Sequence, residues 1–208
     1  PAAKGSPQII RAVDNLKQRG FAIEFILIHG RSFKDVFDEI KRCDFVVDQI
    51  YSDTPMAGFA TEAAWFGKPA VVGGYGLNRL KRYVPEDMWP PSKTCHPDQI
   101  EEAIEELIVD VDQRVRLGCE AQSFVREKWN ATAVAGRYLR LIEGEIPEEW
   151  WLNPDDVLYL EGAGQSVSKT KQIIRDLVSS YDVQALQLSH RPALQTAFLE
   201  FAGINNTK

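Results

Sequence analysis

The sequence predicts an α/β fold, in which a Rossmann-like parallel sheet is flanked by helices and followed by a small, mostly helical C-terminal extension. Two short apolar runs, Phe45–Val47 and Ala70–Val72, are separated by a segment of helical composition. Runs of this kind, closed by a polar residue or glycine, are typical of strands buried on both faces of a parallel sheet. A third observation divides the chain, because the pattern ends near Gly144 and a linker follows. We therefore predict a sheet domain over residues 1–144 and an extension over residues 145–208.

The first predicted helix spans Gln8–Arg19, where apolar residues recur at helical spacing. Ser6 is its expected N-cap, Pro7 its first residue, and Gly20 the residue that ends it. A doubly wound domain normally opens on a strand, and no strand pattern precedes this helix. We therefore expect the sequence to be a piece of a longer protein in which the first strand of the domain is missing.

After the missing first strand and the helix Gln8–Arg19, the sequence predicts a second strand followed by a second helix. Phe21–Ile28 is rich in β-branched and aromatic residues, which favour a strand. Ser32 is expected to cap a helix over Phe33–Arg42, with Asp35 as the acid of a capping box.

The two apolar runs and the chain between them form the predicted βαβ unit, with a loop over Tyr51–Gly58 and a helix over Phe59–Phe66. Open parallel sheets bind ligands at the carboxyl ends of their strands. Glu62 lies in the first turn of this helix, where a carboxylate can accept hydrogen bonds from the hydroxyls of a ribose. Free N–H groups at the helix start can hold a diphosphate. The alternative is that Glu62 only complements the helix dipole, which favours acidic residues in first turns.

Irregular structure is expected from Tyr75 to Thr94, followed by three helices. The first helix begins at His96–Asp98, the second spans Asp112–Lys128, and the third is capped by Asn130 or Thr132 and ends near Gly144. Two groups of charged residues in this part are expected to be solvated, although the basic group can also lie next to an acceptor or a phosphate: Arg79, Lys81 and Arg82, and Glu101, Glu102, Glu105 and Glu106.

The extension begins with a linker in which Trp150 and Trp151 are expected to dock on the domain. A strand-like run over residues 157–160 precedes Gly162–Gly164, a turn superficially similar to a phosphate loop but without the Gly-Lys-Ser/Thr that such loops need. Ser166 is the expected N-cap of an amphipathic helix, and Pro192–Phe201 is predicted as the last helix.

Composition narrows the class of protein. The chain has 208 residues, a net charge of −6 and 26% charged residues, which is typical of a soluble globular protein and argues against general nucleic-acid binding. Three widely spaced cysteines favour reduced thiols and a cytoplasmic location, and three scattered histidines make a metal site unexpected. No apolar run is long enough for a membrane span.

The run that carries most information is GFATEAAWFGKPAVVGG, residues 58–74. It resembles the C-terminal domain of GT-B fold glycosyltransferases of the retaining, glycogen-synthase-like superfamily. That family has a loop glutamate, a Gly-Phe-Gly, a second glutamate, a small-residue helix, a Gly-Lys-Pro or Gly-Leu-Pro, a Val-Val strand and a Gly-Gly turn. The Asp110, Arg114, Gly118 spacing and Trp129 resemble the closing helices of the family, so the resemblance covers residues 4–144. The chain has one strand–helix unit fewer than most members, as in a shortened subgroup.

The resemblance implies a donor site. Glu62 matches the glutamate that binds the ribose, and Lys4-Gly5 matches the pair whose lysine meets the diphosphate. The sugar-contacting glutamate falls at Thr54, beside Asp53, and this departure leaves the donor sugar open. The rest of the loop, Gly58, Phe59 and Ala60, would lie near the donor sugar.

After the second predicted strand come His29, Gly30 and Arg31, at the end where ligands bind. Arg31 is a candidate phosphate contact and His29 a candidate for the nucleoside pocket. The alternative for each of them is a loop residue without a ligand, and the alternative for Lys4 is a solvated lysine.

The resemblance implies a glycosyltransferase of the hexosyltransferase type, which transfers a sugar with retention from a UDP- or GDP-type donor to an unknown glycan, lipid or small molecule. It implies no further cofactor. An N-terminal domain of the same protein would supply much of the acceptor site and any peripheral membrane contact. Positioning can account for about 7–11 kcal/mol of a barrier, so we expect the chain alone to bind nucleotide weakly and not to turn over. A degenerate nucleotide-binding or regulatory module and a sugar-nucleotide epimerase remain as alternatives.

Overall fold

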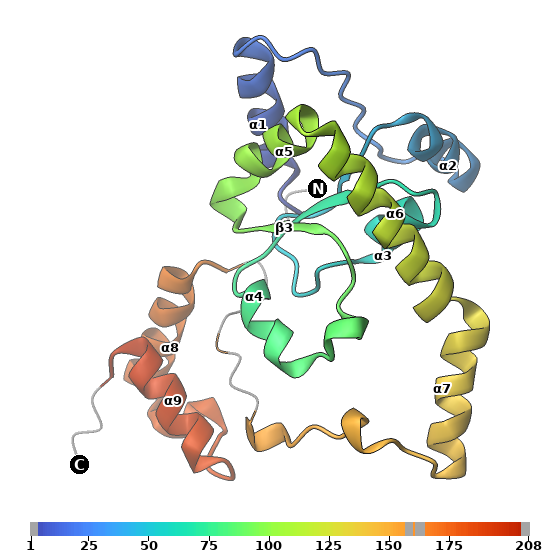
Figure 1. Ribbon diagram of the computed structural model, residues 1–208. Helices are drawn as coiled ribbons and strands as arrows, with labels where there is room; N and C mark the ends of the chain where they lie inside the picture. Colours follow the sequence, from blue (N-terminus) through green and yellow to red (C-terminus); the bar gives the residue numbers. More distant parts are fainter. Residues whose placement is uncertain (1–3, 157–159, 161–164, 205–208) are drawn as a thin grey trace.

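The computed structural model of the protein describes residues 4–156, 160 and 165–204, and its fold is α/β with a large share of helix. Three strands form one parallel sheet in the order β1-β2-β3: Val46–Val47, Ala70–Gly73 and Lys93–Cys95 (Figure 1). Val46 lies opposite Ala70 in the β1–β2 pair, and Val72 lies opposite Thr94 in the β2–β3 pair. The strands expected around Val46 and Val71 are therefore confirmed.

The two connections between strands differ in kind. β1 reaches β2 through α3 (Gly58–Trp65), which confirms the predicted βαβ unit. β2 reaches β3 through α4 (Leu77–Leu80) and the short 3₁₀ helices η2 (Lys81–Tyr83) and η3 (Glu86–Met88). The expectation of irregular structure up to Thr94 was wrong for β3. Its three residues have no apolar pattern, and only the hydrogen bonds to β2 make them a strand.

Helices cover both faces of the sheet (Figure 1). On one face, α1 (Ser6–Gln18) and α5 (Ile100–Val109) bury their apolar side chains around Val71. On the other face, α2 (Phe33–Arg42), α3 and α6 (Val111–Lys128) pack around Ala70 and Val72. Successive β2 side chains thus enter opposite cores, as the alternation of a strand requires. Aliphatic and small residues dominate both cores, as expected for a doubly covered parallel sheet, and Met56 and Phe124 complete the second one.

Local capping signals were good predictors of helix starts. Ser32 accepts a hydrogen bond from Asp35 N at 3.2 Å, Asn130 accepts one from Ala133 N at 2.9 Å, and Ser166 accepts one from Lys169 N at 3.3 Å. Asn130, not Thr132, therefore caps α7 (Ala131–Glu143). The exception is Ser6, which lies inside α1. The N-cap of α1 is Gly5, in a left-handed conformation with φ of 79° and no side-chain cap.

Phe21–Ile28 does not form the predicted strand. The segment is extended and crosses from α1 to α2 without pairing to any described strand (Figure 1). Phe21, Ile23 and Phe25 pack toward the core beneath α1, whereas 54% of the Leu27 surface is exposed. The alternating pattern is present, but a strand also needs a neighbouring backbone to pair with. Between this segment and β1 there is a cavity instead.

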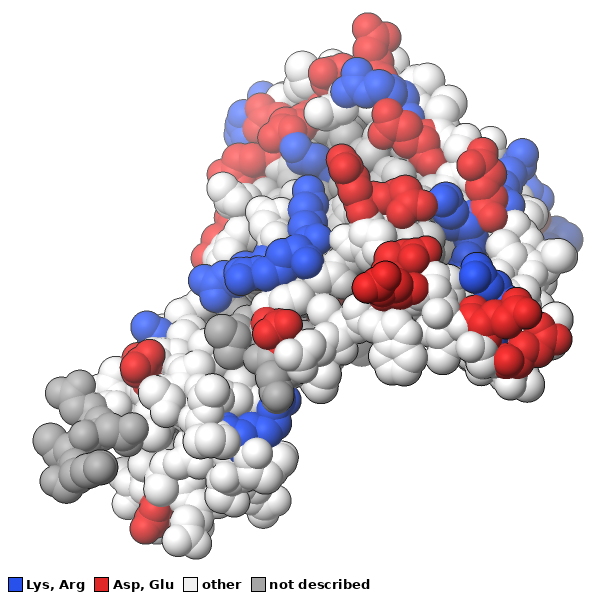
Figure 2. Space-filling view, turned by 60° about the horizontal axis from the view of Figure 1, so that its bottom comes forward, with Lys and Arg blue, Asp and Glu red and all other residues white. Residues whose placement is uncertain are grey.

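The surface has no extended field of one charge in the drawn view. Figure 2 shows acidic and basic side chains interspersed over most of that face. The basic cluster expected to be solvated is partly tied to aromatic rings, with Lys81 Nζ 5.5 Å from the Trp89 ring centre and Arg82 Cζ 5.4 Å from that of Tyr83. No helix within the described ranges is long and apolar enough to cross a membrane.

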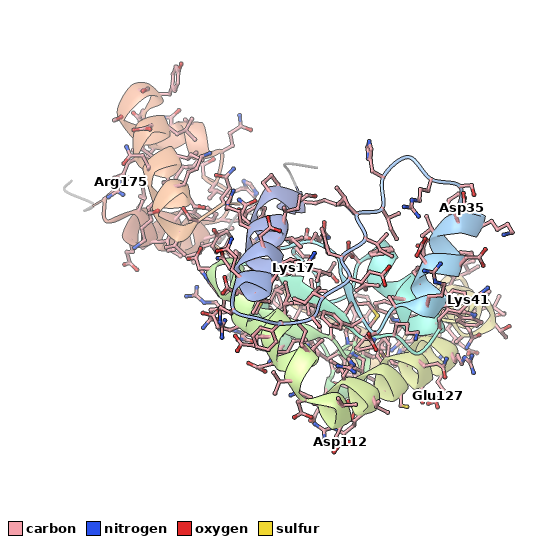
Figure 3. The ribbon with its side chains drawn as sticks, turned by 90° about the horizontal axis from the view of Figure 1, so that it is seen from above. Lys17, Asp35, Lys41, Asp112, Glu127 and Arg175 are labelled. Atoms are coloured by element: carbon pink, nitrogen blue, oxygen red, sulfur yellow. The ribbon has the colours of Figure 1, made fainter. Side chains whose placement is uncertain are left out.

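The extension is helical, as predicted. After η5 (Glu148–Trp150) and η6 (Pro154–Asp156), α8 (Val167–Tyr181), η7 (Val183–Leu186) and α9 (Pro192–Ala202) pack on one another. Figure 3 shows Arg175 of α8 far to one side of Lys17 on α1 and Lys41 on α2. The expected strand-like run and Gly162–Gly164 lie outside the described residues, except for Leu160, which is in no helix or strand.

The two tryptophans of the linker differ in how far their side chains are exposed. The Trp150 ring lies 5.3 Å from the guanidinium carbon of Arg140 on α7 and is partly covered. The expectation that Trp151 docks was wrong, because 70% of its surface is exposed. Trp150 ends η5, whereas Trp151 follows it in extended backbone.

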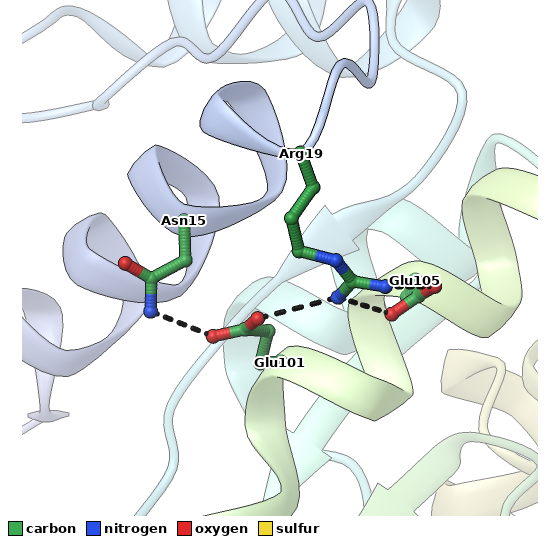
Figure 4. Close-up of polar contacts among 4 residues, drawn as sticks. All are labelled: Asn15, Arg19, Glu101 and Glu105. Atoms are coloured by element: carbon green, nitrogen blue, oxygen red, sulfur yellow. Dashed lines mark hydrogen bonds and ion pairs between the residues drawn. The ribbon is translucent and has the colours of Figure 1, made fainter.

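The acidic face of α5 is not simply solvated. Arg19, at the end of α1, donates two hydrogen bonds to Glu105, each 2.7 Å long, and one of 3.4 Å to Glu101 (Figure 4). Asn15 Nδ2 donates to the other Glu101 oxygen at 2.9 Å, and Glu106 pairs with Lys93 of β3. The face was expected to be solvated; Glu102 and Glu106 are exposed, but α1 and β3 lie beside α5 and supply cations to Glu101, Glu105 and Glu106.

A pair of helical glycines tests the packing of α6 on the sheet. A Cβ on Gly118 would lie 2.3 Å from Gly67 O, whereas a Cβ on Gly136 of α7 would have nothing within 4 Å. Gly118→Ala should lower the free energy of unfolding by about 1–3 kcal/mol, because backbone must move. Gly136→Ala, the matched control, should raise it by about 0.5–1 kcal/mol through helix propensity. Urea denaturation of both variants checks this, and equal effects at the two positions would contradict the packing.

Candidate functional site

A cavity of about 810 Å³ runs along β1, between that strand and residues 22–28. Its walls come from α1, α2, α3 and α5. At one end it reaches the carboxyl end of β1, where parallel sheets bind ligands. Four of the ten residues predicted for the donor site line it: Lys4, Arg31, Phe59 and Glu62.

Asp48, which sequence reasoning passed over, is the central charged group at this end. It follows β1 directly, and its side chain is 1% exposed. Lys4 Nζ lies 3.6 Å from its Oδ1, and the Lys4 side chain is 59% exposed. A lysine so exposed is free to rotate toward another anion, whereas the carboxylate is held in place. The sequence signal that could have identified Asp48 was its position, since it is the polar residue at the end of an apolar strand.

Asp48 also occupies part of the start of α3. Its Oδ2 accepts a hydrogen bond from Ala60 N at 3.3 Å. The N-cap, Ala57, has no side-chain cap of its own, so Asp48 supplies one from the preceding strand. The first intrahelical bond is donated by Thr61 N to Ala57 O at 2.9 Å, which leaves the amides of Gly58 and Phe59 ahead of it. The helix start therefore has fewer unpartnered donors than the sequence led us to expect.

The pKa of the Asp48 carboxyl is raised above its ordinary value, and burial is the main cause. The charge of Lys4 and the hydrogen bond from Ala60 act in the opposite direction and do not fully compensate. The site thus holds a carboxylate whose negative charge is disfavoured by burial, beside an exposed lysine.

Glu62 lines the cavity from α3 and is half-buried. Arg31 lines it too, but its Nη1 donates to Glu39 Oε1 at 2.9 Å, and α2 therefore already holds it. Gly30 is exposed with φ of 64° and does not line the cavity, and neither does His29. The structure therefore does not bring His29 to the predicted nucleoside pocket.

Position 5 requires a glycine because the side chain of Ile50 packs directly against its Cα. A Cβ there would lie 2.1 Å from Ile50 Cγ1, and φ is 79°. Next to it, Lys4 O accepts a hydrogen bond from Ile50 N at 3.1 Å. Together these contacts place the Lys4 side chain over the carboxyl end of β1.

The loop that the resemblance assigns to the donor sugar forms its own turn. The hydroxyl of buried Ser52 donates to Thr54 O at 2.6 Å and accepts from Thr54 N at 3.2 Å. Thr54 Oγ1 accepts from Met56 N at 3.5 Å, and Asp53 is exposed. Neither Asp53 nor Thr54 lines the cavity. Gly58 and Ala60 do not line it either, although the amide of Ala60 is at the site through Asp48.

A row of rings follows the three strand ends. The rings of Tyr51 and Tyr75 are stacked with centres 6.1 Å apart, and Tyr75 meets His96 edge-on at 5.0 Å. Gln8 Nε2 donates to the Tyr51 hydroxyl at 2.6 Å, and burial raises the pKa of Tyr75. Sequence reasoning missed this row, although each member comes shortly after a strand. The three rings form an aromatic surface next to Lys4 and Asp48.

The cysteines offer no reactive group here. All three are free, and Cys119 is exposed on α6. Cys95 ends β3, and burial raises its pKa to about 12, so the thiol remains protonated at neutral pH and is a poor nucleophile. Among the described residues, no three His, Cys, Asp or Glu side chains are grouped so that they could hold a metal ion.

No protein-family model, curated protein or solved structure matches this chain. The carboxyl end of β1 combines an exposed lysine, a buried carboxylate and the start of α3, and Glu62 lies one turn into that helix and lines the same cavity.

Asp48→Asn tests the buried charge through pH dependence. Because the folded pKa of Asp48 is raised, its contribution to stability is fully present below the unfolded pKa and is lost as pH rises through the folded pKa. Each unit of elevation corresponds to about 1.4 kcal/mol. An amide at position 48 does not titrate, so the stability of Asp48→Asn lacks this pH dependence. The free energy of unfolding of the wild type should therefore fall relative to that of the variant between about pH 4 and pH 7.

Urea denaturation across that pH range measures the difference. Asp53→Asn removes one exposed carboxylate from the next loop and controls for net charge. A difference that stays constant with pH, or grows in the other direction, would show that the Asp48 carboxylate is not destabilised by burial.

Proposed function

We propose that this chain is the nucleotide-sugar-binding domain of a retaining glycosyltransferase, with the Rossmann-like sheet of the GT-B fold. The observation that carries the proposal is that Lys4, Phe59 and Glu62 all line one cavity, and that this cavity reaches the carboxyl end of β1 at Asp48. These residues match the family pattern, and α/β sheets bind nucleotides at this place.

Lys4 would hold the diphosphate. Its exposed side chain is paired with Asp48 at 3.6 Å, a length that leaves room for exchange of partner. A diphosphate carries more charge than Asp48 and, at the cavity mouth, loses less hydration. When Lys4 turns to it, Asp48 keeps the hydrogen bond from Ala60 N. The amides of Gly58 and Phe59, at the positive end of α3, add to the attraction.

Glu62 would accept hydrogen bonds from the ribose hydroxyls. It lies on the same helix as the phosphate-facing amides, one turn further on, and faces the cavity. A ribose lies next to the diphosphate in every nucleoside diphosphate, so one ligand can meet Lys4 and Glu62 together. A carboxylate acceptor on a diol adds roughly 1.5–3 kcal/mol of interaction.

A nucleotide-binding module that does not transfer sugar is the second candidate. It is favoured by Thr54, which stands where the family has a glutamate and whose hydroxyl is engaged in its own turn. The two candidates share the nucleotide site and differ only at the sugar. Donor hydrolysis or transfer by the intact protein, assayed with UDP- and GDP-sugars, separates them: turnover supports the transferase, and binding without turnover supports the module.

Thermal unfolding against UDP, GDP, ADP, CDP and dTDP tests the shared site. A nucleotide at about 100 times its dissociation constant should stabilise the chain by about 2.7 kcal/mol, which raises the midpoint by several degrees. Glu62→Ala should weaken the effective nucleotide about tenfold, by roughly 1.4 kcal/mol. Glu102→Ala, on the exposed side of α5, should leave it unchanged. The site is refuted if none of the five nucleotides shifts the wild type, or if both variants respond alike.

Asp48→Asn should have the opposite effect on nucleotide affinity. The amide oxygen can still accept from Ala60 N, but the negative charge that competes for Lys4 is gone. The gain should be on the order of 1 kcal/mol, or about fivefold in affinity, and should shrink at high salt. Titration calorimetry with the nucleotide identified above measures it. Unchanged or weaker binding would place the diphosphate away from Lys4.

A further inference from the structure

Helix α7 leaves the sheet domain at the end of α6 and lies well apart from α8 and α9 (Figure 1). Every side chain of this helix is at least partly exposed. Two arginines on one side of α7 hold it to the rest of the molecule. The Arg137 guanidinium donates to Lys128 O, and that of Arg140 lies over the Trp150 ring at 5.3 Å from its centre. The opposite side of the helix therefore faces outward.

The outward side of α7 is apolar along the whole length of the helix. At 3.6 residues per turn, five exposed apolar residues fall within one sector of about 100°. These residues, called the α7 stripe, are Ala131, Ala135, Tyr138, Leu139 and Ile142. The exposed fraction is 81% for Ile142, 64% for Tyr138 and 53% for Leu139. A helical stripe of this width normally faces a protein core, so its exposure marks an interaction surface.

Small and large residues of the α7 stripe occupy different halves of the helix. Ala131 and Ala135 lie in the first half, whereas Tyr138, Leu139 and Ile142 lie in the second. A second α7 packed in the same direction would place large side chains on large ones and leave a gap between the alanines. Packed in the opposite direction, the large half of each helix lies on the small half of the other. A two-fold axis between two copies produces this antiparallel arrangement.

One antiparallel register pairs large and small residues along the whole stripe. When the two-fold axis passes midway along the stripe, Ile142 lies opposite Ala131 of the second copy. In the same register Tyr138 lies opposite Ala135 of the second copy. Each large side chain then fills the space above a small one, as close packing requires. Because the axis is two-fold, each of these contacts occurs twice.

The charges of α7 agree with this arrangement. The first turn of the helix has no acidic residue in its sequence. The antiparallel register brings Glu143 of the second copy beside that turn, where the positive end of the helix favours a carboxylate. Arg137 and Arg140 remain on the side that faces their own molecule. Pairing of two copies therefore brings no like charges together along the stripe.

We propose that the α7 stripe is a homodimer interface, in which two copies of this chain pack α7 against α7 in antiparallel orientation. The match of the stripe to its own reverse identifies the occupant as a second copy. The stripe is roughly 16 Å long, and the contact is smaller than a standard interface of about 800 Å² per partner. The dimer is therefore weak, with a dissociation constant of roughly 10–100 µM. The proposal does not rest on the proposed nucleotide function, because α7 lies outside the cavity.

Sedimentation equilibrium of the whole 208-residue chain, from about 5 µM to about 500 µM, tests the proposal. The mean mass should rise from that of one chain toward that of two. Tyr138→Ala leaves alanines facing each other, and Ala135→Tyr leaves tyrosines facing each other, so each should weaken the dimer at least about tenfold. The double variant Ala135→Tyr/Tyr138→Ala exchanges the two sizes. It should restore the dissociation constant to within about threefold of the wild-type value, since the register pairs these two positions.

A matched pair of charge variants separates the α7 stripe from non-specific association. Leu139→Glu places a carboxylate in the stripe and should abolish dimerisation, while circular dichroism remains that of the wild type because the position is exposed. Val115→Glu places the same charge at an exposed apolar position of α6 and should leave the dissociation constant unchanged.

Three outcomes would overturn the antiparallel dimer. One is a chain that remains monomeric at the highest concentration, in which case a second copy does not cover the stripe. Another is a mass that continues to rise beyond that of two chains, because a two-fold interface closes on itself. The third is a double variant that dimerises no better than Tyr138→Ala.

Discussion

Close backbone contact at the carboxyl ends of β1 and β2 determines how the rest of the structure is arranged. A Cβ on Gly73 would lie 2.7 Å from Ile50 Cα, and one on Gly74 would lie 2.3 Å from Ser52 O. Only residues without a side chain allow the two loops to approach so closely. Gly5 does the same from the other side against Ile50. Three separate segments therefore meet at one edge of the sheet, and their side chains converge there.

The consequence of this convergence is a buried carboxylate. Asp48 ends an apolar strand, so its side chain enters the core between β1 and α3, where burial raises its pKa. The hydrogen bond from Ala60 and the exposed Lys4 reduce the cost without removing it.

The second consequence concerns the outer edge of the sheet. Proteins normally cover or charge an exposed edge strand, because unpaired backbone groups invite other chains. Within the described residues no strand pairs with the outer edge of β1, and side chains of α1, α2 and α5 line the cavity beside it. The end of the cavity at Lys4 and Asp48 and the stretch along β1 therefore differ in chemistry.

The sequence alone determined the features that depend on neighbours in the chain. The helix caps Ser32, Asn130 and Ser166, the βαβ unit and the helical extension all follow from local hydrogen bonding and from periodicity. Of the ten residues predicted for a donor site, Lys4, Arg31, Phe59 and Glu62 line the cavity and the other six do not.

Only the tertiary structure decided what depends on distant partners. β3 is a strand because β2 pairs with it, and Phe21–Ile28 is not one because no strand within the described part of the chain pairs with it. Three further features depend on residues that are distant in the sequence. They are the pairing of Asp48 with Lys4, the ring contacts from Tyr51 to His96, and the hydrogen bonds of Arg19 to α5. The physical reason is common to all of these. Strand pairing, a pKa shift and an ion pair each depend on two groups in contact. A local sequence pattern shows one of these groups and not its partner.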